Sequence, residues 1–360
     1  MLGATGSIGK NTLAVLRHYP DDFEAVLLTS NTNRDGVLAL GCEFPRAAVL
    51  AAGIDGKEAV LTAIADCGAD ICVNGIAGAA GLEPSVAALD AGMDLALANK
   101  ETIVMAGPLV LKRAAQKNVN ILPVDSEHSA IFHLLRGYGG AEVQELILTA
   151  SGGPLRTYTK EQLARVSVQE ALAHPTWKMG TKISLDSATL ANKGLEVIEA
   201  AHLFNTSADR IKVLIHPQSI VHSMIRLRNN AVYAQASKPD MRLPIQEALF
   251  WPNTTVSPFA ALDFSGVTLA FTAPDSERFP MLPLAYQAAK AGGIYPLVYN
   301  AANEIAAAAF LQNKIRFFDI PRLVSNVLTL EWNRSNIEED LQAILHYDTI
   351  ARARAKELLQ

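Results

Sequence analysis

Short apolar runs alternate with helical patterns through the first third of the chain. We predict strands at residues 23–29, 47–50, 70–76, 94–99 and 119–124, several of them bounded by Gly, Asp or Asn. Nearly continuous apolar strands separated by helices are typical of a parallel sheet covered on both faces. In such a sheet, ligands bind outside the carboxyl ends of the strands, so polar residues at those ends are the first candidates for a site.

The rest of the pattern predicts two further parts. We expect an α/β fold with a Rossmann-like domain at residues 1–124, a second domain at 125–251, a linker at 252–276 and a C-terminal helical bundle at 277–360. Only Met1 and Leu2 precede the first glycine, which is short for a central strand. Either the start lies further upstream or the first strand is truncated.

Composition narrows the classes of protein that fit. The chain has 360 residues, of which 50% are hydrophobic and 19% charged, enough for well-formed cores. Its net charge of -5 excludes a global attraction to nucleic acid or to an anionic membrane, so an anionic substrate needs a local pocket. We find neither a membrane-spanning run nor a signal peptide at the start. Cys42, Cys67 and Cys72 are interpreted as reduced core residues of a cytoplasmic protein.

The glycine-rich stretch GATGSIG opens the first strand–helix unit. Gly3, Gly6 and Gly9 suit a tight turn that lets backbone N–H groups approach a pyrophosphate, although an ordinary strand-to-helix turn is the alternative. The next strand ends in TSNTNR, without the acidic residue that binds the ribose hydroxyls of NAD. Hydroxyls, amides and Arg34 favour the 2′-phosphate of NADP instead.

The fourth and fifth strands end in reactive residues. ANKET places Lys100 where it could stabilise charge on a substrate oxygen, or where it could simply be solvated. PVDSEHSA places Asp125 and Glu127 two residues apart, which in an extended segment would turn both to one side, with no lysine or arginine beside them. Such a pair favours Mg²⁺ or Mn²⁺. A helix N-terminus capped by Asp125 or Ser126 explains the same residues equally well.

The middle of the chain adds a second set of candidates. Ser151, in TASGGP, lies beside two glycines in a possible anion nest or a plain turn. Trp177, in HPTWKMG, either closes over a ligand or packs on the domain body. Lys193 and Glu196 share one helical face, as many surface pairs do, but Glu196 would also supply a third carboxylate to a metal site.

A resemblance joins these segments. The chain resembles the 1-deoxy-D-xylulose 5-phosphate reductoisomerase family, which reduces and isomerises that sugar phosphate to 2-C-methyl-D-erythritol 4-phosphate on the methylerythritol phosphate route to isoprenoids. The matching segments follow one another along nearly the whole chain: GATGSIG, ALANKET, PVDSEHSAIF, TASGGP, HPTWKMGTKISLDSATLANKGLEVIEA, IHPQSIVHSM, KPDMRLPI and NAANEIAAAAF.

The resemblance implies a role for each matching residue. It implies that residues 125–251 form an α+β catalytic and dimerisation domain and that the enzyme is a homodimer. It also implies NADPH as cofactor, and Mg²⁺ or Mn²⁺ as metal, with Co²⁺ as a further candidate. The implied metal ligands are Asp125, Glu127 and Glu196, of which Glu127 and Glu196 also contact substrate together with Lys100 and Ser126. The implied phosphate site is Ser151, His174, Ser187, Asn192 and Lys193. The lid at 174–182 carries Trp177 and Met179, and His222 faces the same site. The implied cofactor residues are Thr5, Gly6, Ser7, Ile8, Asn31, Asn33, Asn99, Glu101 and Gly180.

Two rival functions share parts of this pattern. Another NADP-dependent oxidoreductase, such as a homoserine or semialdehyde dehydrogenase, would share the sheet and the glycine turn but would not need three carboxylates. A non-catalytic NADP sensor would bind the cofactor without turnover and would tolerate loss of Glu196. Asn31 departs from the family, which usually has glycine there.

Overall fold

The computed structural model describes residues 1–138, 142–177, 179–332 and 339–359. These residues form two compact units. Unit 1 comprises Met1–Thr102, Val110–Ser129 and Asp240–Ala261, and unit 2 comprises Ile103–Leu109, Ala130–Pro239 and Leu262–Gln360. Residue 178 of the predicted lid, and residues 139–141, 333–338 and 360 of the predicted domains, lie outside the described residues.

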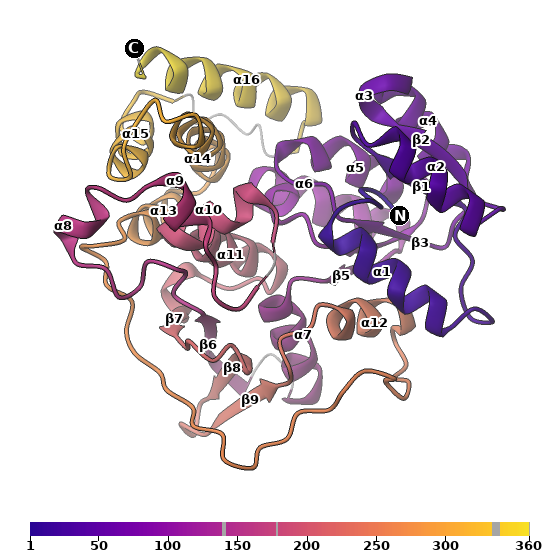
Figure 1. Ribbon diagram of the computed structural model, residues 1–360, viewed down its shortest axis with the longest axis horizontal. Helices are drawn as coiled ribbons and strands as arrows, with labels where there is room; N and C mark the ends of the chain where they lie inside the picture. Colours follow the sequence, from indigo (N-terminus) through magenta and orange to yellow (C-terminus); the bar gives the residue numbers. More distant parts are fainter. Residues whose placement is uncertain (139–141, 178, 333–338, 360) are drawn as a thin grey trace. The chain divides into compact units, whose positions relative to one another are not determined.

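Unit 1 is built on parallel strands (Figure 1). The strands are β1 (Leu27–Ser30), β2 (Ala48–Ala51), β3 (Ile71–Asn74), β4 (Asp94–Leu97) and β5 (Ile121–Pro123). β1 pairs with β2, and β4 lies between β3 and β5, all in parallel. The first residues of the chain join the two sheets, because Leu2 N–H donates to Val73 O and Thr29 N–H donates to Met1 O. The carboxyl ends of all five strands therefore share one edge.

Helices cover this sheet and contribute to its core. They are α1 (Ser7–His18), α2 (Arg34–Glu43), α3 (Ala52–Asp55), α4 (Lys57–Asp66), α5 (Leu82–Asp90) and α12 (Arg242–Phe250), with the start and end of α6 (Lys100–Lys117) and the start of α7 (Ser126–Tyr138). Leu13 and Leu16 of α1 pack with Leu28 and Val37, and Leu249 of α12 packs against the same cluster. Removing these aliphatic side chains from water is what holds helices of this length to the sheet.

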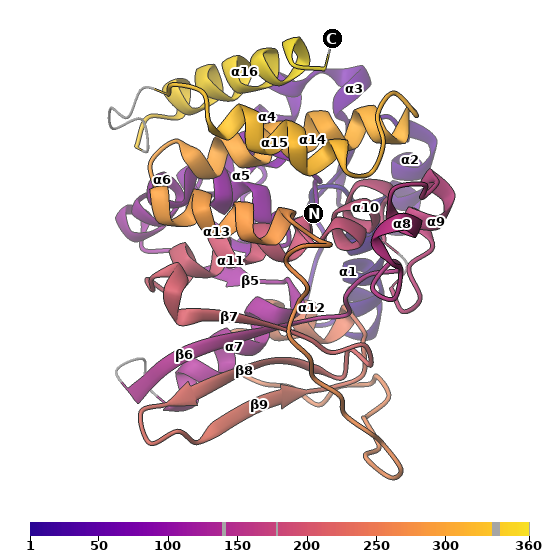
Figure 2. The same cartoon turned by 90° about the vertical axis from the view of Figure 1, so that its left-hand side faces the viewer.

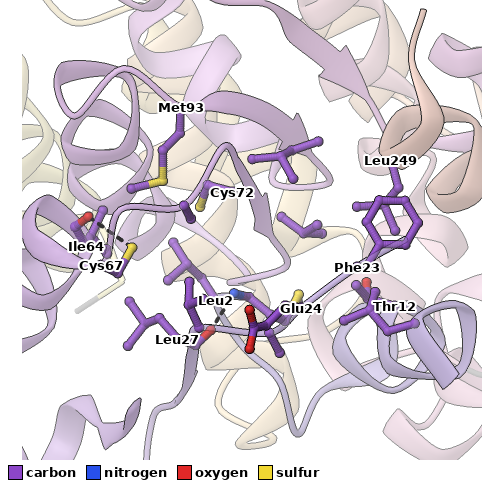
Figure 3. Close-up of a pocket in the computed structure, with 17 residues that line it drawn as sticks. Leu2, Thr12, Phe23, Glu24, Leu27, Ile64, Cys67, Cys72, Met93 and Leu249 are labelled. Carbon is purple, nitrogen blue, oxygen red and sulfur yellow. Dashed lines mark hydrogen bonds between the residues drawn. The ribbon is translucent and has the colours of Figure 1, made fainter. Parts of the chain in front are cut away.

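The slot between β1 and β3 is only partly filled. A cavity of about 70 Å³ lies there, lined among others by Phe23, Leu27, Ile64, Cys72 and Leu249. In Figure 3 these apolar side chains surround Leu2 at the start of the chain. The Met1 ammonium is buried and donates to Leu27 O at 2.7 Å, and burial lowers its pKa. The cavity thus lies beside Met1 and Leu2.

Unit 2 has a mixed four-stranded sheet (Figure 2). Its strands are β6 (Val143–Ala150), β7 (Ile211–Ile215), β8 (Val221–Leu227) and β9 (Val232–Ala236). They lie in the order β7-β6-β8-β9, with β6 parallel to β7 and antiparallel to β8. Val232 and Tyr233 of the edge strand β9 are exposed.

Helices of unit 2 surround one long buried helix. Unit 2 contains α8 (Lys160–Leu163), α9 (Val168–Leu172), α10 (Thr181–Thr189), α11 (Ala191–Leu203), α13 (Met281–Ala291), α14 (Tyr295–Leu311), α15 (Asp319–Leu328) and α16 (Leu341–Glu357), together with the middle of α6 and most of α7. The buried helix is α14, which contacts α10, α11, α13, α15 and α16. α14 is apolar on most of its surface, with Leu297, Val298, Ala302 and Ala306 all buried, as expected for a helix that other helices enclose. The C-terminal helices thus pack on α10 and α11, which carry predicted site residues.

The predicted strands and fold class are confirmed, with local differences. All five predicted strands of the first third are present, and the last third is helical. The division into three domains stays a prediction, because the two units group the chain differently and α12 packs in unit 1. The interpretation of the cysteines as core residues is wrong for Cys42, which is exposed, whereas Cys72 is buried. Among the helices of the described residues, none is long and apolar enough to cross a membrane.

Candidate active site

The glycine turn follows Met1 and Leu2, which are hydrogen-bonded to β1 and β3, and it leads into α1. Gly3 has φ +78°, and a Cβ there would lie 3.0 Å from Gly75 O, so glycine is required both by conformation and by space. A Cβ on Gly9 would lie 2.3 Å from Ala4 O, so its absence lets α1 approach the turn. Gly6 and Ser7 are exposed at the helix N-terminus. The turn therefore has the geometry that the predicted pyrophosphate site needs.

The residues after β1 combine amides with a positive charge. Asn33 caps α2 by accepting a hydrogen bond from Gly36 N–H at 3.0 Å. Arg34 forms an ion pair with Asp55 of α3, with Nη1 3.0 Å from Oδ1. Sequence reasoning missed Asp55, since no signal connects it with position 34. Its carboxylate holds the guanidinium near the end of β1, the place for which the sequence predicts contact with the 2′-phosphate of NADP.

Arg34→Ala should weaken the preference for NADPH over NADH. We expect the KM for NADPH to rise about tenfold, because one charge-assisted contact to a phosphate contributes on the order of 1–3 kcal/mol. The KM for NADH should change less than twofold, since NADH lacks that phosphate. Steady-state kinetics with both cofactors measures the ratio. Equal losses for both cofactors would contradict the assignment of Arg34 to the 2′-phosphate.

A buried network supports the end of β4. Asn99 caps α6: its Oδ1 accepts from Thr102 N–H at 3.0 Å, and its Nδ2 donates to Ile76 O at 2.7 Å. Asn74 and Ser85 continue this network beneath the turn. The Asn99 amide is thus committed to protein partners, and its effect on the predicted nicotinamide site is to orient the start of α6, which carries Lys100 and Glu101.

Lys100 lies directly against the carboxylate motif. Its Nζ is 2.6 Å from Asp125 Oδ2, and both side chains are largely buried. The expectation that no cation lies beside these carboxylates is therefore wrong, because Lys100 reaches Asp125 from the neighbouring strand end. The extended geometry is wrong as well, since Glu127 lies in the first turn of α7. Asp125 Oδ1 accepts from Glu127 N–H at 3.3 Å, so the capping alternative holds.

His128 follows Glu127 in the same motif. It is fully buried, and its Nδ1 lies 3.3 Å from Asp125 Oδ1. Ser126 Oγ donates to Glu127 Oε2 at 2.6 Å. Unit 1 thus presents two carboxylates whose orientations are fixed by a lysine, a histidine and a serine. Caps of this kind and hard-cation ligands use the same oxygen atoms, so the two interpretations of the motif are compatible.

In unit 2, Ser151 and His174 form one hydrogen-bonded pair. His174 Nδ1 accepts from Trp177 N–H at 2.9 Å and from Thr176 N–H at 3.2 Å. The proton of the neutral ring therefore lies on Nε2, which donates to Ser151 Oγ at 3.0 Å. Burial, and secondarily the charge of Arg156, lower the pKa of His174 and favour this neutral form. The Ser151 hydroxyl hydrogen remains available to an anion.

The other predicted phosphate residues lie on α10 and α11, and α10 packs against the turn that follows Ser151. Gly153 packs so closely on α10 that a Cβ there would lie 2.5 Å from Ser187 O. Leu190, with φ +62°, turns the chain from α10 into α11. There Asn192 Nδ2 donates to Glu196 Oε1 at 2.5 Å, and Lys193 Nζ forms a salt bridge with Glu196 Oε2. Lys193 and Glu196 are buried, so the alternative of an ordinary surface pair is wrong.

The predicted lid is only partly exposed. The Trp177 ring lies near His222 of β8, with ring centroids 6.5 Å apart and the ring planes tilted by 55°. Met179 is half-buried, and Gly180 is exposed. Arg156 is a positive charge that sequence reasoning missed: its Nη1 lies 3.4 Å from Gly153 O, beside the Ser151 turn. The sequence signal that could have found Arg156 is its position, two residues after SGGP and close to the predicted anion nest.

These features define a class of protein. A parallel sheet with a glycine turn before its first helix, and an arginine in place of the ribose-binding acid, is typical of NADP-dependent oxidoreductases. Family models then agree along the chain: 1-deoxy-D-xylulose 5-phosphate reductoisomerase at residues 1–53 and 45–107, the C-terminal domain of that enzyme at 121–204, and the DXP reductoisomerase C-terminal domain at 236–354. The chain belongs to the 1-deoxy-D-xylulose 5-phosphate reductoisomerase family.

Individual relatives are similar in sequence to this chain over nearly their full length. The chain is 48% identical to the 1-deoxy-D-xylulose 5-phosphate reductoisomerase of Gloeobacter violaceus, covering 100% of this chain and 97% of the relative. It is 47% identical to that of Chlorobium chlorochromatii, with 100% and 98% covered.

Solved structures agree as well. A crystal structure of DOX-P reductoisomerase in complex with NADPH, fosmidomycin and magnesium matches with a TM-score of 0.90 and 37% identity, over 99% of this chain and 97% of that one. The enzyme from Zymomonas mobilis in complex with NADPH matches with a TM-score of 0.89 and 38% identity, over 100% and 98%.

The predicted family, fold class and enzyme class are thereby confirmed, and the chain is an NADPH-dependent reductoisomerase. Its activity is the predicted conversion of 1-deoxy-D-xylulose 5-phosphate to 2-C-methyl-D-erythritol 4-phosphate. A match along the whole chain decides against a homoserine or semialdehyde dehydrogenase. The assignment of single residues rests on the geometry above.

Proposed function

We propose that Asp125, Glu127 and Glu196 bind the divalent ion on which this reaction depends. The donor set supports this, because carboxylate oxygens are the ligands that Mg²⁺ and Mn²⁺ prefer. Each half of the set is already oriented by charge: Asp125 contacts Lys100, and Glu196 contacts Lys193. The bound ion supplies Lewis-acid stabilisation of the ketone and hydroxyl oxygens of the substrate.

Lys100 and Ser126 act on the same part of the substrate. Lys100 is nearly buried, so its charge interacts strongly with an oxygen that becomes negative during the carbon rearrangement, a retro-aldol and aldol sequence. Ser126 and Glu127 are hydrogen-bonded to each other and can hold a substrate hydroxyl in place. Together these side chains orient the substrate backbone.

The phosphate end of the substrate binds at the second set of residues. We propose that Ser151, His174, Ser187, Asn192 and Lys193 hold it. The His174 bond to Ser151 and the Lys193 charge support this, since one orients a hydroxyl donor and the other offsets the charge of the anion. Trp177 and Met179 then cover the substrate and keep water from the intermediate.

NADPH binds along the strand edge of unit 1. We propose that Thr5, Gly6, Ser7 and Ile8 bind its pyrophosphate, that Asn31 and Asn33 lie at its ribose phosphate, and that Asn99, Glu101 and Gly180 lie toward its nicotinamide. The bound cofactor supplies the hydride that reduces the aldehyde. The close-packed glycine turn and the hydrogen-bonded Asn99 network orient the parts of unit 1 that the cofactor would contact.

We further propose a homodimer and a cytoplasmic location. β9 is an edge strand with Val232 and Tyr233 exposed, and such an edge can pair with the same edge of a second copy. Cys42, Cys67 and Cys72 are free thiols, which is usual in reducing compartments.

The test of the proposed function is NADPH oxidation. We expect absorbance at the nicotinamide band to fall when 1-deoxy-D-xylulose 5-phosphate is added with Mg²⁺ or Mn²⁺, to stop on chelation, and to resume when excess metal is restored. The single observation that carries the proposal is that the carboxylates and the phosphate set occupy the family-matched segments. Turnover that continues unchanged in excess chelator would contradict the metal site.

A further inference from the structure

One face of α14 contacts both segments that carry the proposed phosphate-binding residues. Tyr299 and Asn303 are four residues apart on this helix, so their side chains project from the same face. Both are buried. α14 belongs to the C-terminal helices, which carry none of the predicted site residues.

Asn303 is hydrogen-bonded to α10. Its Nδ2 donates to Asp186 Oδ1 at 3.0 Å, and both side chains are shielded from water. Asp186 Oδ2 in turn lies 2.8 Å from Lys182 Nζ, one turn earlier on the same helix. Asp186 directly precedes Ser187, so this contact sets the rotation of the helical turn from which the Ser187 hydroxyl projects. A buried, charge-assisted bond of this kind holds its geometry strongly, because breaking it leaves a carboxylate underpaired.

Tyr299 is packed against α11. A Cβ on Gly194 would lie 2.7 Å from Tyr299 Oη and 2.6 Å from Ala285 Cβ of α13, so only glycine allows this approach. Tyr299 Oη is itself held by donating to Met281 O at 3.1 Å. Burial, and secondarily Asp186, raise the pKa of Tyr299 well above its ordinary value, which keeps the hydroxyl a donor. Gly194 directly follows Lys193.

We propose that Asn303, acting through Asp186, and Tyr299, acting against Gly194, are positioning residues for the phosphate end of the substrate. One face of α14 sets the relative placement of Ser187 on α10 and of Lys193 on α11. The C-terminal helices thereby take part in substrate recognition without touching the substrate. This inference rests on the proposed phosphate site.

The direct test is Asn303→Leu, with inorganic phosphate as the probe. We expect the inhibition constant for phosphate and the KM for the sugar phosphate to rise together, by between about tenfold and a hundredfold, because a small misplacement of binding groups has effects of that size. The KM for NADPH should change less than twofold, since the residues proposed to bind it, Gly180 apart, lie in unit 1.

A charge-swapped pair separates positioning from general stability. Asn303→Asp alone places two carboxylates together and should be at least as damaging as Asn303→Leu. Combined with Asp186→Asn, it restores a donor and an acceptor in reversed order, and phosphate inhibition should return to within about threefold of the wild-type value. Rescue of this kind would not follow if position 303 served only to fill space.

Tyr286→Phe is the matched control. Tyr286, on α13, donates to Ile211 O of β7 at 2.9 Å, so the variant loses a comparable hydrogen bond between a C-terminal helix and another part of unit 2. It should lower the melting temperature while leaving phosphate inhibition unchanged. If Asn303→Leu behaves in the same way, the proposal is wrong. Should the wild-type chain show no turnover, the proposed function fails, and phosphate-induced stabilisation of wild type and Asn303→Leu still decides the positioning role.

Discussion

Glu196→Gln should lower kcat by about a thousandfold, roughly 4 kcal/mol of transition-state stabilisation. The substitution keeps the shape and the acceptor for Asn192 but removes one of three negative charges that we propose to bind the metal. It also leaves Lys193, which is buried, without the carboxylate that neutralises it. Steady-state kinetics over a metal titration measures the loss, and we expect the metal concentration for half-maximal activity to rise as well.

The control for this variant is Glu304→Gln. Glu304, on α14, pairs with Arg352 at 2.8 Å, so this variant also removes the carboxylate of an ion pair within unit 2. It should retain activity within about threefold, in the range of an ordinary surface or half-buried substitution. Circular dichroism of both variants shows whether each is folded. A folded Glu196→Gln protein with near wild-type kcat and metal dependence would refute its assignment as a ligand.

The second large effect concerns the slot between β1 and β3. Adding four apolar residues, such as Ile-Ala-Val-Ile, before Met1 should raise the free energy of unfolding by about 3 kcal/mol and the melting temperature by roughly 5 °C or more. The added strand would fill the cavity beside Phe23, Leu27 and Cys72 and would pair with strand edges on both sides. Thermal unfolding measures the gain.

The expected stabilisation has two sources, the burial of apolar side chains and the removal of the buried charge at Met1. An extension of Gly-Ser-Gly-Ser separates them. It converts the buried Met1 ammonium to an amide but adds no apolar surface, so it should give only a small part of the gain. Equal stabilisation by both extensions would show that the cavity is not a strand site.

The dependence of protein stability on pH gives an independent check that the Met1 amino group is buried. Burial lowers the pKa of the Met1 amino group below its ordinary value of 8.0. Between the two pKa values the unfolded chain binds the proton and the folded chain does not. This group therefore has no effect on stability above pH 8.0, and it lowers the free energy of unfolding as the pH falls from 8.0 through the lowered pKa. Either extension should remove this dependence.

The sequence alone determined the fold class and the family. Strands at the five apolar runs, the glycine turn and the order of the motifs are local or linear features, and each survives in the structure. A parallel sheet brings the carboxyl ends of its strands to one edge, so Asn99, Lys100 and Asp125 could be grouped without coordinates.

Only the tertiary structure decided how the charges are paired. Lys100 reaches Asp125 from the neighbouring strand, and Arg34 pairs with Asp55 from another element, at sequence separations that no periodicity predicts. The link between Asp186 and Asn303, 117 positions apart, depends on how α14 packs against α10. Side-chain pairing of this kind follows from the close packing of helices and strands, which apolar patterns determine only as faces and not as atom-to-atom contacts.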